Sequence, residues 1–399
     1  MAAASQPWPK ETEWPVRHAG EALLRTVGPP TISAVQARVF VTACYDRYVV
    51  RPGQSSVPAV SLSFPRRRLF RGRPAGSVRG AGWPGCPGWP LYSGVVSLFV
   101  ADDTVLVADG GLATELEARG NDLSDSLWSA RLLADAPEQI LDAHLAFFRA
   151  GAVIATSASY QASFEGFARR GLDRGQAAGL MRRSVDLAQA ARDQMAADGR
   201  ARWVAASAGP YGAALADGSE YRGRYGRSVR ELAAWHRPRL EVLAGAGPDV
   251  LALETVPDID EAEALMTAVA GLGIPAWLSY SIAGGRTRAG QPLAAAFAVP
   301  AGMPDIVAVG VNCCAPADVP AAIAIAREVT GKPVIVYPNS GEEWDAHRRA
   351  WTGQSAYCPA QPRQWISAGA DIIGGCCRVR PADIAQIART VRSAPPGSA

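Results

Sequence analysis

From Leu98 onward, short apolar and β-branched runs alternate with longer stretches in which apolar positions recur every three or four residues. Short apolar runs predict strands, whereas the period of 3.6 residues predicts amphipathic helices. The predicted strands are Val105–Ala108, Val153–Ser157, Trp203–Ser207, Val250–Leu253, Ala276–Ser279, Ile306–Val311, Val334–Tyr337 and Asp371–Ile373. The helices predicted between them include Pro137–Ala150, Gln176–Ala197, Val229–Ala246, Ile259–Ala270, Val319–Thr330, Pro359–Ala368 and Ala382–Val391.

This alternation indicates a parallel sheet, because parallel neighbours need a crossover connection that is usually a helix. Eight such units between residues 98 and 395 predict a closed α/β TIM barrel of the (β/α)8 type. An open doubly wound sheet is the alternative. The count of eight, and the absence of a glycine-rich phosphate loop after the first strand, favour the barrel.

The first 97 residues are a different kind of sequence, rich in Pro, Trp, Gly and Arg and without sustained periodicity. Segments such as residues 65–71 and 82–90 are unsuited to long helices or inner strands. We therefore divide the chain into an irregular N-terminal extension, residues 1–97, and a barrel domain, residues 98–395. The extension is expected to be disordered, or to be an upstream region translated because the start codon was assigned too early. A basic targeting or nucleic-acid-binding arm is the alternative.

Composition and charge narrow the class of protein. Hydrophobic residues make up 48% of the chain and charged residues 19%, which is typical of a globular protein. No apolar run reaches membrane-spanning length, so no membrane partner is predicted. Residues 1–100 carry 12 Lys and Arg against 4 Asp and Glu, whereas the rest carries 28 against 33. The mildly acidic barrel therefore predicts no nucleic-acid partner.

Cysteine usage points to a reducing compartment. The seven cysteines are an odd number and include two adjacent pairs, which does not fit a secreted disulfide framework. A cytoplasmic protein with metal-binding thiols fits better.

Two of the predicted strands end in cysteines, at Gly310-Val311-Asn312-Cys313 and at Gly374-Gly375-Cys376-Cys377. In a TIM barrel the carboxyl ends of the strands carry the chemistry, and these two strands are separated by one other. Three thiolates converging there would hold Zn²⁺ and leave its fourth position open, as in a catalytic zinc site. Cys314 is expected to be a packed thiol. The alternative for Cys376 and Cys377 is a vicinal disulfide or a pair of small core residues.

Two acids, Asp109 and Glu254, end apolar strands. A buried acid is costly unless it is paired or hydrogen-bonded. One interpretation is a helix cap or a salt bridge within the barrel. The other is a pair of carboxylates that grips a substrate ammonium group.

Several stretches together resemble the homocysteine S-methyltransferase family from about Val105 to Val391. They are Asp109–Glu117, Ser159–Ala162, Gly209–Gly212, Asp217–Gly223, Glu254-Thr255, Gly310–Cys313, Tyr337–Glu342 and Gly374–Arg378. The resemblance implies a Zn²⁺ ion held by Cys313, Cys376 and Cys377, with the homocysteine thiolate as its exchangeable fourth ligand. It also implies that Asp109 and Glu254 hold the homocysteine amino group, and that the backbone at Gly110 helps to seat the amino acid.

Within this family, the stretches at Pro210-Tyr211 and Asp217–Gly223 are most similar to the branch that uses S-methylmethionine and generally also accepts S-adenosylmethionine. The betaine-using branch is less similar in these loops. No cobalamin- or folate-binding module is present, which excludes the cobalamin-dependent methionine synthase reaction for this chain alone.

The resemblance thus predicts an enzyme that moves a methyl group from a sulfonium donor to homocysteine and forms methionine, with no catalytic group beyond zinc activation of the thiol. Aromatic faces attract cations, so Tyr160, Tyr211, Tyr221 and Tyr337 are candidates for the donor site. Alternatives within the class are a betaine donor or another small thiol or selenol as acceptor. Outside it, the alternative is a thiol redox protein that uses the Cys376-Cys377 pair.

Overall fold

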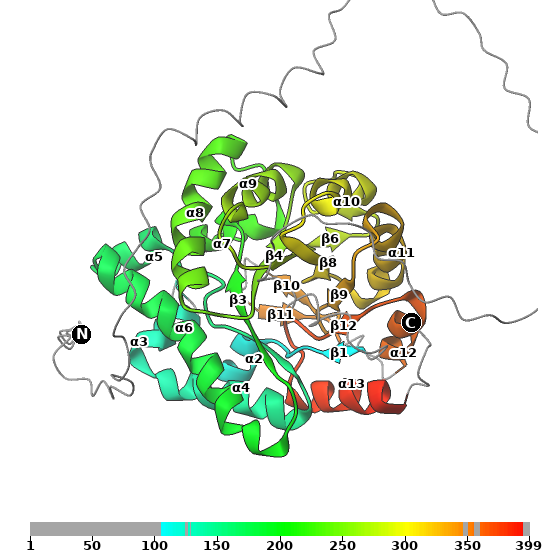
Figure 1. The fold of residues 1–399 in the computed structure, drawn as a ribbon, viewed down its shortest axis with the longest axis horizontal. Helices are drawn as coiled ribbons and strands as arrows, with labels where there is room; N and C mark the ends of the chain where they lie inside the picture. The colour runs from blue at the N-terminus through cyan, green and yellow to red at the C-terminus, as the bar shows by residue number, and fades with distance from the viewer. Residues whose placement is uncertain (1–104, 124–126, 128, 346–349, 355–359, 394–399) are drawn as a thin grey trace, which may run out of the picture. The chain divides into compact units, whose positions relative to one another are not determined.

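The structure is a computed structural model and describes residues 105–123, 127, 129–345, 350–354 and 360–393. Its main sheet consists of the parallel strands β1 (Leu106–Val107), β2 (Ile154–Thr156), β3 (Trp203–Ala208), β4 (Val250–Val256), β5 (Ala276–Tyr280), β8 (Ile306–Asn312), β9 (Val334–Tyr337) and β12 (Ile372–Ile373). From β2 to β12 each strand of this sheet pairs with the next one along the chain, and β12 pairs with β1. A parallel bridge between Ala108 and Ile154 then joins β1 to β2 and closes the sheet. The predicted TIM barrel is therefore confirmed (Figure 1).

Helices follow the strands and surround the sheet. They are α2 (Leu112–Ala118), α3 (Ser129–Asp135), α4 (Pro137–Ala150), α5 (Phe164–Ala168), α6 (Arg174–Gln194), α7 (Tyr211–Leu215), α8 (Val229–Gly245), α9 (Ile259–Val269), α10 (Leu293–Ala301), α11 (Val319–Thr330), α12 (Gln361–Ala368) and α13 (Pro381–Ser393). The short 3₁₀ turns are η2 (Ala196–Asp198), η3 (Ser219–Tyr221) and η4 (Pro316–Asp318). Two antiparallel hairpins follow β5 and β9: β6 (Ile282–Ala283) with β7 (Arg286–Thr287), and β10 (Glu343–Asp345) with β11 (Ala350–Thr352).

Most of the predicted elements agree closely with these bounds. All the predicted strands exist, and α4 and α11 begin and end where the sequence predicts. Helix α10 is absent from the helices predicted by range, because Leu293–Ala301 is almost wholly apolar and so shows no amphipathic period. Glycines end α4 and α12: Gly151 and Gly369 take the left-handed conformation at φ 112° and φ 99°.

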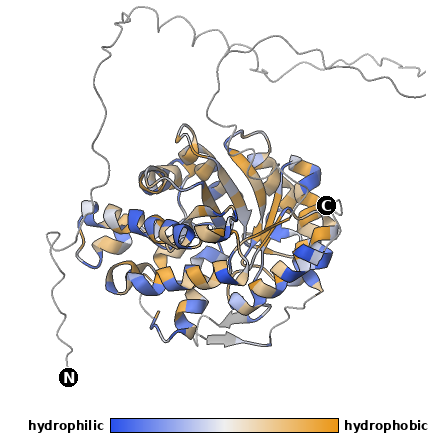
Figure 2. Ribbon diagram, turned by 60° about the horizontal axis from the view of Figure 1, so that its bottom comes forward, coloured by the Kyte–Doolittle hydropathy of each residue, from blue (hydrophilic) through white to orange (hydrophobic). Residues whose placement is uncertain are grey.

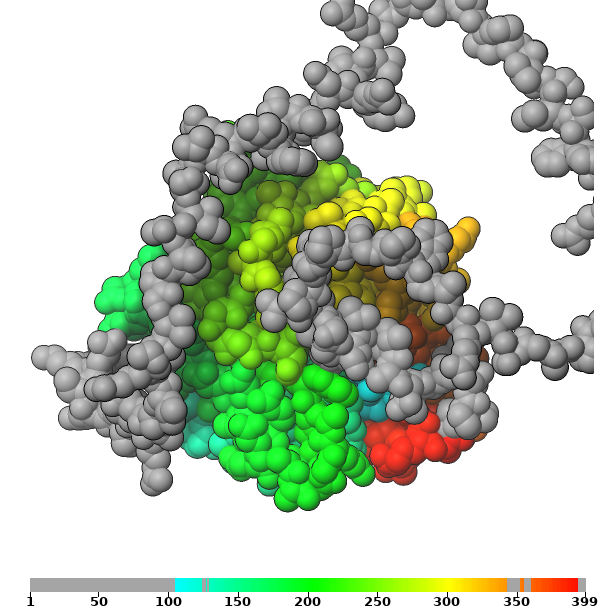
Figure 3. All heavy atoms as spheres, viewed as in Figure 1, coloured from blue at the N-terminus to red at the C-terminus, as the bar shows by residue number. Residues whose placement is uncertain are grey.

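The core has two layers. Residues that point into the barrel form one cluster, which includes Ala205, Ala252, Trp277, Ala308 and Ile335. A larger cluster lies between the strands and the helices. In Figure 2 the strands are mostly hydrophobic, while the hydrophilic residues lie on the outer faces of the helices. The space-filling view shows side chains of neighbouring helices in contact, from the green of α6 and α8 to the red of α13 (Figure 3).

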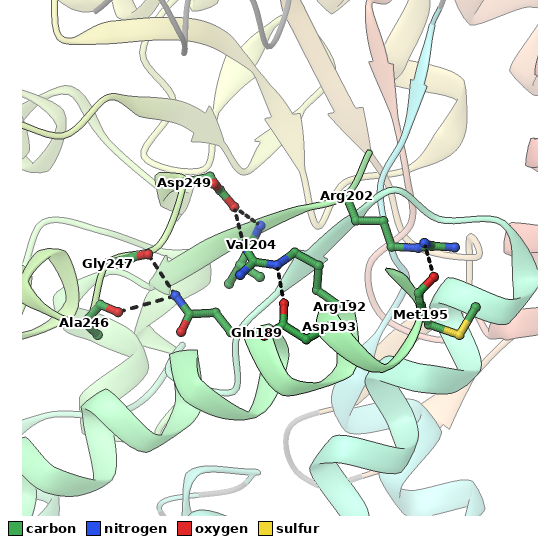
Figure 4. Close-up of polar contacts among 9 residues, drawn as sticks. All are labelled: Gln189, Arg192, Asp193, Met195, Arg202, Val204, Ala246, Gly247 and Asp249. Carbon is green, nitrogen blue, oxygen red and sulfur yellow. Dashed lines mark hydrogen bonds and ion pairs between the residues drawn. The ribbon is translucent and has the colours of Figure 1, made fainter. Parts of the chain in front are cut away.

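The amino ends of the strands are held by contacts that involve no predicted site residue. The Asp249 carboxylate accepts a hydrogen bond from Val204 N at 2.7 Å and pairs with Arg192 at 3.4 Å. The Gln189 amide, on α6, donates to the Gly247 carbonyl at 2.8 Å. These contacts tie α6 and the segment before β4 to the start of β3 (Figure 4). Because polar groups at this face of a TIM barrel support stability rather than catalysis, they offer sites for control variants.

The predicted extension, residues 1–97, lies outside the described residues. None of the helices in the described part of the chain has both the length and the apolar composition that crossing a membrane requires.

Candidate metal and substrate site

The inward-facing positions change from apolar to polar toward the carboxyl ends of the strands. Successive residues of a strand point to opposite faces, so Val250 and Ala252 of β4 belong to the apolar interior and Glu254 is the next inward residue. The same alternation places a polar side chain at the upper end of most strands. These residues are Thr156, Ser207, Glu254, Ser279, Asn312 and Tyr337. The barrel therefore ends in a buried polar layer, directly beneath the loops that carry the cysteines.

The three predicted ligands come together at this end of the barrel. The Sγ atoms of Cys313, Cys376 and Cys377 all lie within 4.8 Å of one another, and those of Cys376 and Cys377 are 4.0 Å apart. Tetrahedral Zn²⁺ bound to sulfur at about 2.3 Å separates its sulfurs by about 3.8 Å. The spacing of the three thiols is therefore close to that of three sulfurs on one tetrahedral metal ion.

The backbone after β9 holds both cysteine loops. Cys313 N donates to the Tyr337 carbonyl at 3.3 Å, and Cys376 N donates to the Pro338 carbonyl at 2.8 Å. Ser340 N donates back to the Cys377 carbonyl at 3.0 Å. Strand β9 lies between β8 and β12 in the sheet, so it connects the two segments that carry the clustered cysteines.

Local backbone geometry turns the thiols toward one another. Cys313 has φ 47°, in the left-handed region that non-glycine residues rarely adopt. Beside the other two thiols, Gly111 and Gly375 allow close packing: a Cβ on Gly111 would lie 2.5 Å from the Cys376 carbonyl, and one on Gly375 would lie 2.1 Å from Val379. A Cβ on Gly374 would lie 2.7 Å from the Asp109 carbonyl, so both glycines before Cys376 serve close packing.

The thiols stabilise one another electrostatically. Hydrogen bonds from the Cys376 and Cys377 thiols lower the pKa of Cys313 well below its usual range. The same contacts raise the pKa of Cys376 and Cys377. Cys314, by contrast, is buried in the hydrophobic core, and burial raises the pKa of its thiol far above the ordinary value. The structure thus groups Cys313 with Cys376 and Cys377 and leaves Cys314 among the apolar residues.

Asp109 follows β1 and faces β2. Its two carboxylate oxygens accept hydrogen bonds from Thr156 N at 2.7 Å and from the Thr156 hydroxyl at 2.9 Å. Burial nevertheless raises the pKa of Asp109 to about 7. The next residue, Gly110, is packed so closely that a Cβ would lie 2.5 Å from the Val379 carbonyl.

Glu254 is held by side chains of two other strands, the neighbouring β3 and the more distant β9. The Ser207 hydroxyl donates to its Oε1, and the Tyr337 hydroxyl also contacts the carboxylate. Burial raises the pKa of Glu254 to about 7, and repulsion from Cys313 and Asp109 adds to this effect. Glu254 is therefore close to both the thiol cluster and Asp109, and no cationic side chain among the described residues pairs with either acid.

The candidate tyrosines fall into three groups. Tyr221 contacts the Cys313 thiol, and Tyr160 lies near the same thiol and hydrogen-bonds to Thr255. Tyr337 is buried beneath Glu254 and accepts a hydrogen bond from Trp277 Nε1 at 3.1 Å. Tyr211 instead packs edge-on against Tyr225 and Trp235, at 5.3 and 5.1 Å between ring centroids. The structure thus brings Tyr160 and Tyr221 to the thiols and places Tyr211 against α8.

Two further residues hold the site and were given no role from the sequence. Thr255, the residue after Glu254, has φ 61°, which is unusual for a β-branched residue. Its polar groups are bound by Asn312. Asn312 Oδ1 accepts from Thr255 N, and Asn312 Nδ2 donates to the Thr255 hydroxyl, both at 2.8 Å. Both residues stand next to predicted site residues in the chain, but only their proximity in the fold reveals the contact.

Known proteins share this fold and much of this sequence. The family model described as Homocysteine S-methyltransferase matches residues 106–391. A Zea mays protein named Homocysteine S-methyltransferase 4 is 48% identical over 72% of this chain and 90% of its own. The Homocysteine S-methyltransferase of Escherichia coli K12 is 47% identical over 71% of this chain and 94% of its own. The crystal structure of the Escherichia coli homocysteine methyltransferase MmuM in its metallated form matches with a TM-score of 0.67 and 44% identity, over 74% of this chain and 99% of that one.

Proposed function

The chain belongs to the homocysteine S-methyltransferase family, and from this premise we propose that it transfers a methyl group from a sulfonium donor to the sulfur of homocysteine, forming methionine. It is a methyltransferase of the TIM-barrel class. The observation that carries the proposal is the position of the three clustered thiols beside two buried, unpaired carboxylates at the same end of the barrel.

We further propose that the metal is Zn²⁺ and that Cys313, Cys376 and Cys377 hold it. Three cysteine thiols at this spacing fit a tetrahedral ion, and three protein ligands leave the open position of a catalytic site. Coordination to zinc deprotonates a bound thiol. A free thiol with a pKa near 8.5 is only a few per cent thiolate at pH 7, so this removes roughly 2 kcal/mol of protonation cost.

The amino-acid end of homocysteine is assigned to Asp109 and Glu254. Both carboxyls are buried without a positive partner, and their pKa values are raised to about 7. A bound ammonium group would supply the positive charge and favour their charged form. The Thr156 and Ser207 contacts fix the two carboxylates before substrate arrives. The backbone at Gly110 lies beside Asp109, where it is placed to seat the rest of the amino acid.

The chain needs little acid–base chemistry for this reaction. The homocysteine sulfur forms a new bond to the methyl carbon, while the bond from that carbon to the donor sulfur breaks. The bond's electron pair returns to the donor sulfur, which leaves as a neutral thioether and requires no proton. The task of the side chains is therefore to align the three atoms and to exclude competing nucleophiles. Tyr221, which contacts the Cys313 thiol, and Tyr160, which is coupled to it, are the aromatic groups proposed for this purpose.

Two alternatives differ in chemistry. A betaine donor, or an acceptor that is another small thiol or selenol, keeps the metal but changes one substrate. The paired carboxylates support an acceptor with an ammonium group. A thiol redox role for Cys376 and Cys377 would need neither Asp109 nor Glu254.

A single assay set tests the proposal. The purified protein, reduced and loaded with zinc, is given homocysteine with S-methylmethionine, S-adenosylmethionine or betaine in separate reactions. Methionine formed from a sulfonium donor, together with one zinc per chain, supports the proposal. Methionine from betaine alone, or full activity without metal, would reject it.

A further inference from the structure

Glu220 is a mostly buried acid beside the thiol cluster that neither the fold nor the proposed acceptor site explains. It lies in the turn η3, in the connection between β3 and α8. Its Oε2 atom is buried and accepts no hydrogen bond among the described residues. A buried carboxylate oxygen without a hydrogen-bond donor is unfavourable when the group is charged. The carboxylate of Glu220 receives a hydrogen bond from its own backbone N–H, whereas those of Asp109 and Glu254 are held by side chains and backbone of other strands.

The turn that carries Glu220 is held rigidly, so the side chain is not simply free to move into solvent. A Cβ on Gly212 would lie 2.5 Å from Glu220 N, which shows how closely the two segments pack. Ser219 N donates to the Asp217 carboxylate at 2.9 Å and closes the start of the turn. After the turn, Arg224 N donates to the Asp258 carboxylate at 2.7 Å and anchors the loop to α9.

The surroundings of Glu220 are negative and aromatic. Burial, together with repulsion from Cys313 and Asp217, raises the pKa of Glu220 to about 7. Arg222, on the same turn, is exposed and pairs with Asp217 at 3.6 Å, and its charge only partly offsets this rise. The adjacent Tyr221 contacts the Cys313 thiol, and the Glu220 charge acts on Tyr160. Glu220 is therefore coupled to the Cys313 thiol and to the two tyrosines, and no donor among the described residues satisfies its Oε2 atom.

The proposed reaction supplies the missing positive charge. Three thiolates on one Zn²⁺ leave a net negative charge, and the acceptor thiolate adds a second one. A cation is attracted to this region, and of the two substrates only the donor carries a positive charge at its reacting sulfur. The charge disappears when the methyl group leaves, so a carboxylate that binds it strengthens donor binding without being needed in the product.

We propose that Glu220 is a specificity-determining residue that binds the sulfonium centre of the methyl donor and selects a cationic donor over its neutral thioether. This assignment rests on the proposed function of the site. Tyr160 and Tyr221 supply the aromatic walls, and Glu220 supplies the counter-charge. Glu220 thereby distinguishes S-methylmethionine from methionine, which has the same amino-acid end but no charge on sulfur.

The test compares binding of these two molecules to the zinc-loaded protein by isothermal titration calorimetry, for the wild type and Glu220→Gln. Loss of a charge–charge attraction in a mostly buried site should raise the dissociation constant of S-methylmethionine about tenfold or more in the variant. The dissociation constant of methionine, the zinc content and the KM of homocysteine should stay as in the wild type. The KM of S-methylmethionine should rise, with kcat unchanged or higher.

The matched control is Glu241→Gln, which removes an exposed carboxylate of α8. It should leave every one of these values unchanged. A stability measurement at pH 8 without ligands separates a binding role from a structural one: Glu220→Gln should melt at the wild-type temperature or above it, because an unpartnered charge has been removed. A clear fall in melting temperature would show that Glu220 is structural and would overturn the assignment.

Three further outcomes are decisive. Equal weakening of S-methylmethionine and methionine would place Glu220 at the donor's ammonium group instead, and unchanged affinity for both would remove it from the donor site. Either result rejects the inference while wild-type methionine formation leaves the proposed function standing. If the wild type forms no methionine from any donor, the proposed function fails and this inference fails with it.

Discussion

The side-chain amide of Asn312 holds both polar groups of Thr255. Its Oδ1 accepts from Thr255 N and its Nδ2 donates to the Thr255 hydroxyl, each at 2.8 Å. Asn312 immediately precedes Cys313, and Thr255 immediately follows Glu254. One buried amide thus links the strand that carries a proposed metal ligand to the strand that carries a proposed substrate carboxylate. Both Thr255 and Cys313 have positive φ, so the bond also secures two unfavourable backbone conformations.

Replacement of Asn312 by Ala should therefore weaken both halves of the site. The variant leaves the buried Thr255 N–H without a partner, which costs about 1–3 kcal/mol of unfolding free energy. Loss of support for Cys313 should reduce zinc affinity by about 10- to 100-fold, as is usual for residues that orient ligands. Competition with a chelator and urea denaturation measure the two effects. Gln189→Ala, at the amino end of the barrel, is the control and should keep wild-type zinc affinity; equal zinc affinity in both variants would contradict the role of Asn312.

Substitution of the two cysteines that follow β8 should change the zinc content in different ways. Cys313→Ser removes a clustered thiol, and we expect the purified protein to lose its zinc and its methyl transfer activity together. Cys314→Ala removes a buried core thiol and should keep one zinc per chain, with a loss of about 1 kcal/mol in stability. Metal analysis of both variants, purified under reducing conditions, measures the difference. Zinc retained by Cys313→Ser would exclude it as a ligand.

The pH dependence of stability should include a contribution from Glu261. This buried acid of α9 is surrounded by titratable and charged groups, which are Tyr225, His236, Arg239 and Asp258. Burial raises the pKa of Glu261 from 4.5 to about 7, so the folded state binds its proton more tightly than the unfolded state. The resulting stability is complete below pH 4.5 and is lost as the pH rises through 7.

Glu261→Gln removes this titration. Between pH 4.5 and 7 the slope of unfolding free energy against pH should become flatter by up to about 1.4 kcal/mol per pH unit, the effect of one proton. Urea denaturation at several pH values measures the slope. Glu241→Gln, at an exposed position, should leave the slope as it is in the wild type. An unchanged slope in Glu261→Gln would mean that Glu261 is ionised in the folded protein throughout this range.

A glycine in the barrel wall should tolerate no side chain. A Cβ on Gly310, in β8, would lie 1.7 Å from the Ile335 carbonyl of β9, so Gly310→Ala forces the two strands apart. We expect a loss of about 3 kcal/mol or more in unfolding free energy, at the upper end of overpacking effects. Gly245→Ala, at the end of α8, meets no atom within 4 Å and should stabilise the protein by about 0.5–1 kcal/mol. Thermal denaturation of the pair checks both signs; a stable Gly310→Ala protein would contradict the close packing of β8 against β9.

The fold could be predicted from the sequence because the chain repeats one unit. Each apolar run is long enough for a strand, and helices such as α4 and α11 show a clear amphipathic period and end at a glycine. The spans that could not be predicted lack this signal. Helix α10 is apolar on all sides, and the β6–β7 hairpin consists of two-residue strands.

The proposed ligands and carboxylates were visible for a similar reason. Each is an unusual residue at the end of an apolar strand, and the barrel brings the carboxyl ends of all strands together. The supporting contacts were not visible. Glu220, for example, lies in the stretch Asp217–Gly223 that resembles the family. That its Oε2 atom has no hydrogen-bond donor follows only from the packing of Gly212 and Asp217 around it. A single sequence does not record which polar atom remains unpaired.

The residues of the site are divided between two separate parts of the barrel. The thiols lie on the loops after β8 and β12, and the backbone after β9 holds them, whereas Glu220 and Tyr221 lie on the loop after β3, anchored to α9. On the proposed roles, substitutions between residues 209 and 225 would change which methyl donor is accepted while the three cysteines stay in place, except where they remove the contact of Tyr221 with the Cys313 thiol. Such a barrel would diverge toward a new donor in small steps, without first losing its proposed metal site.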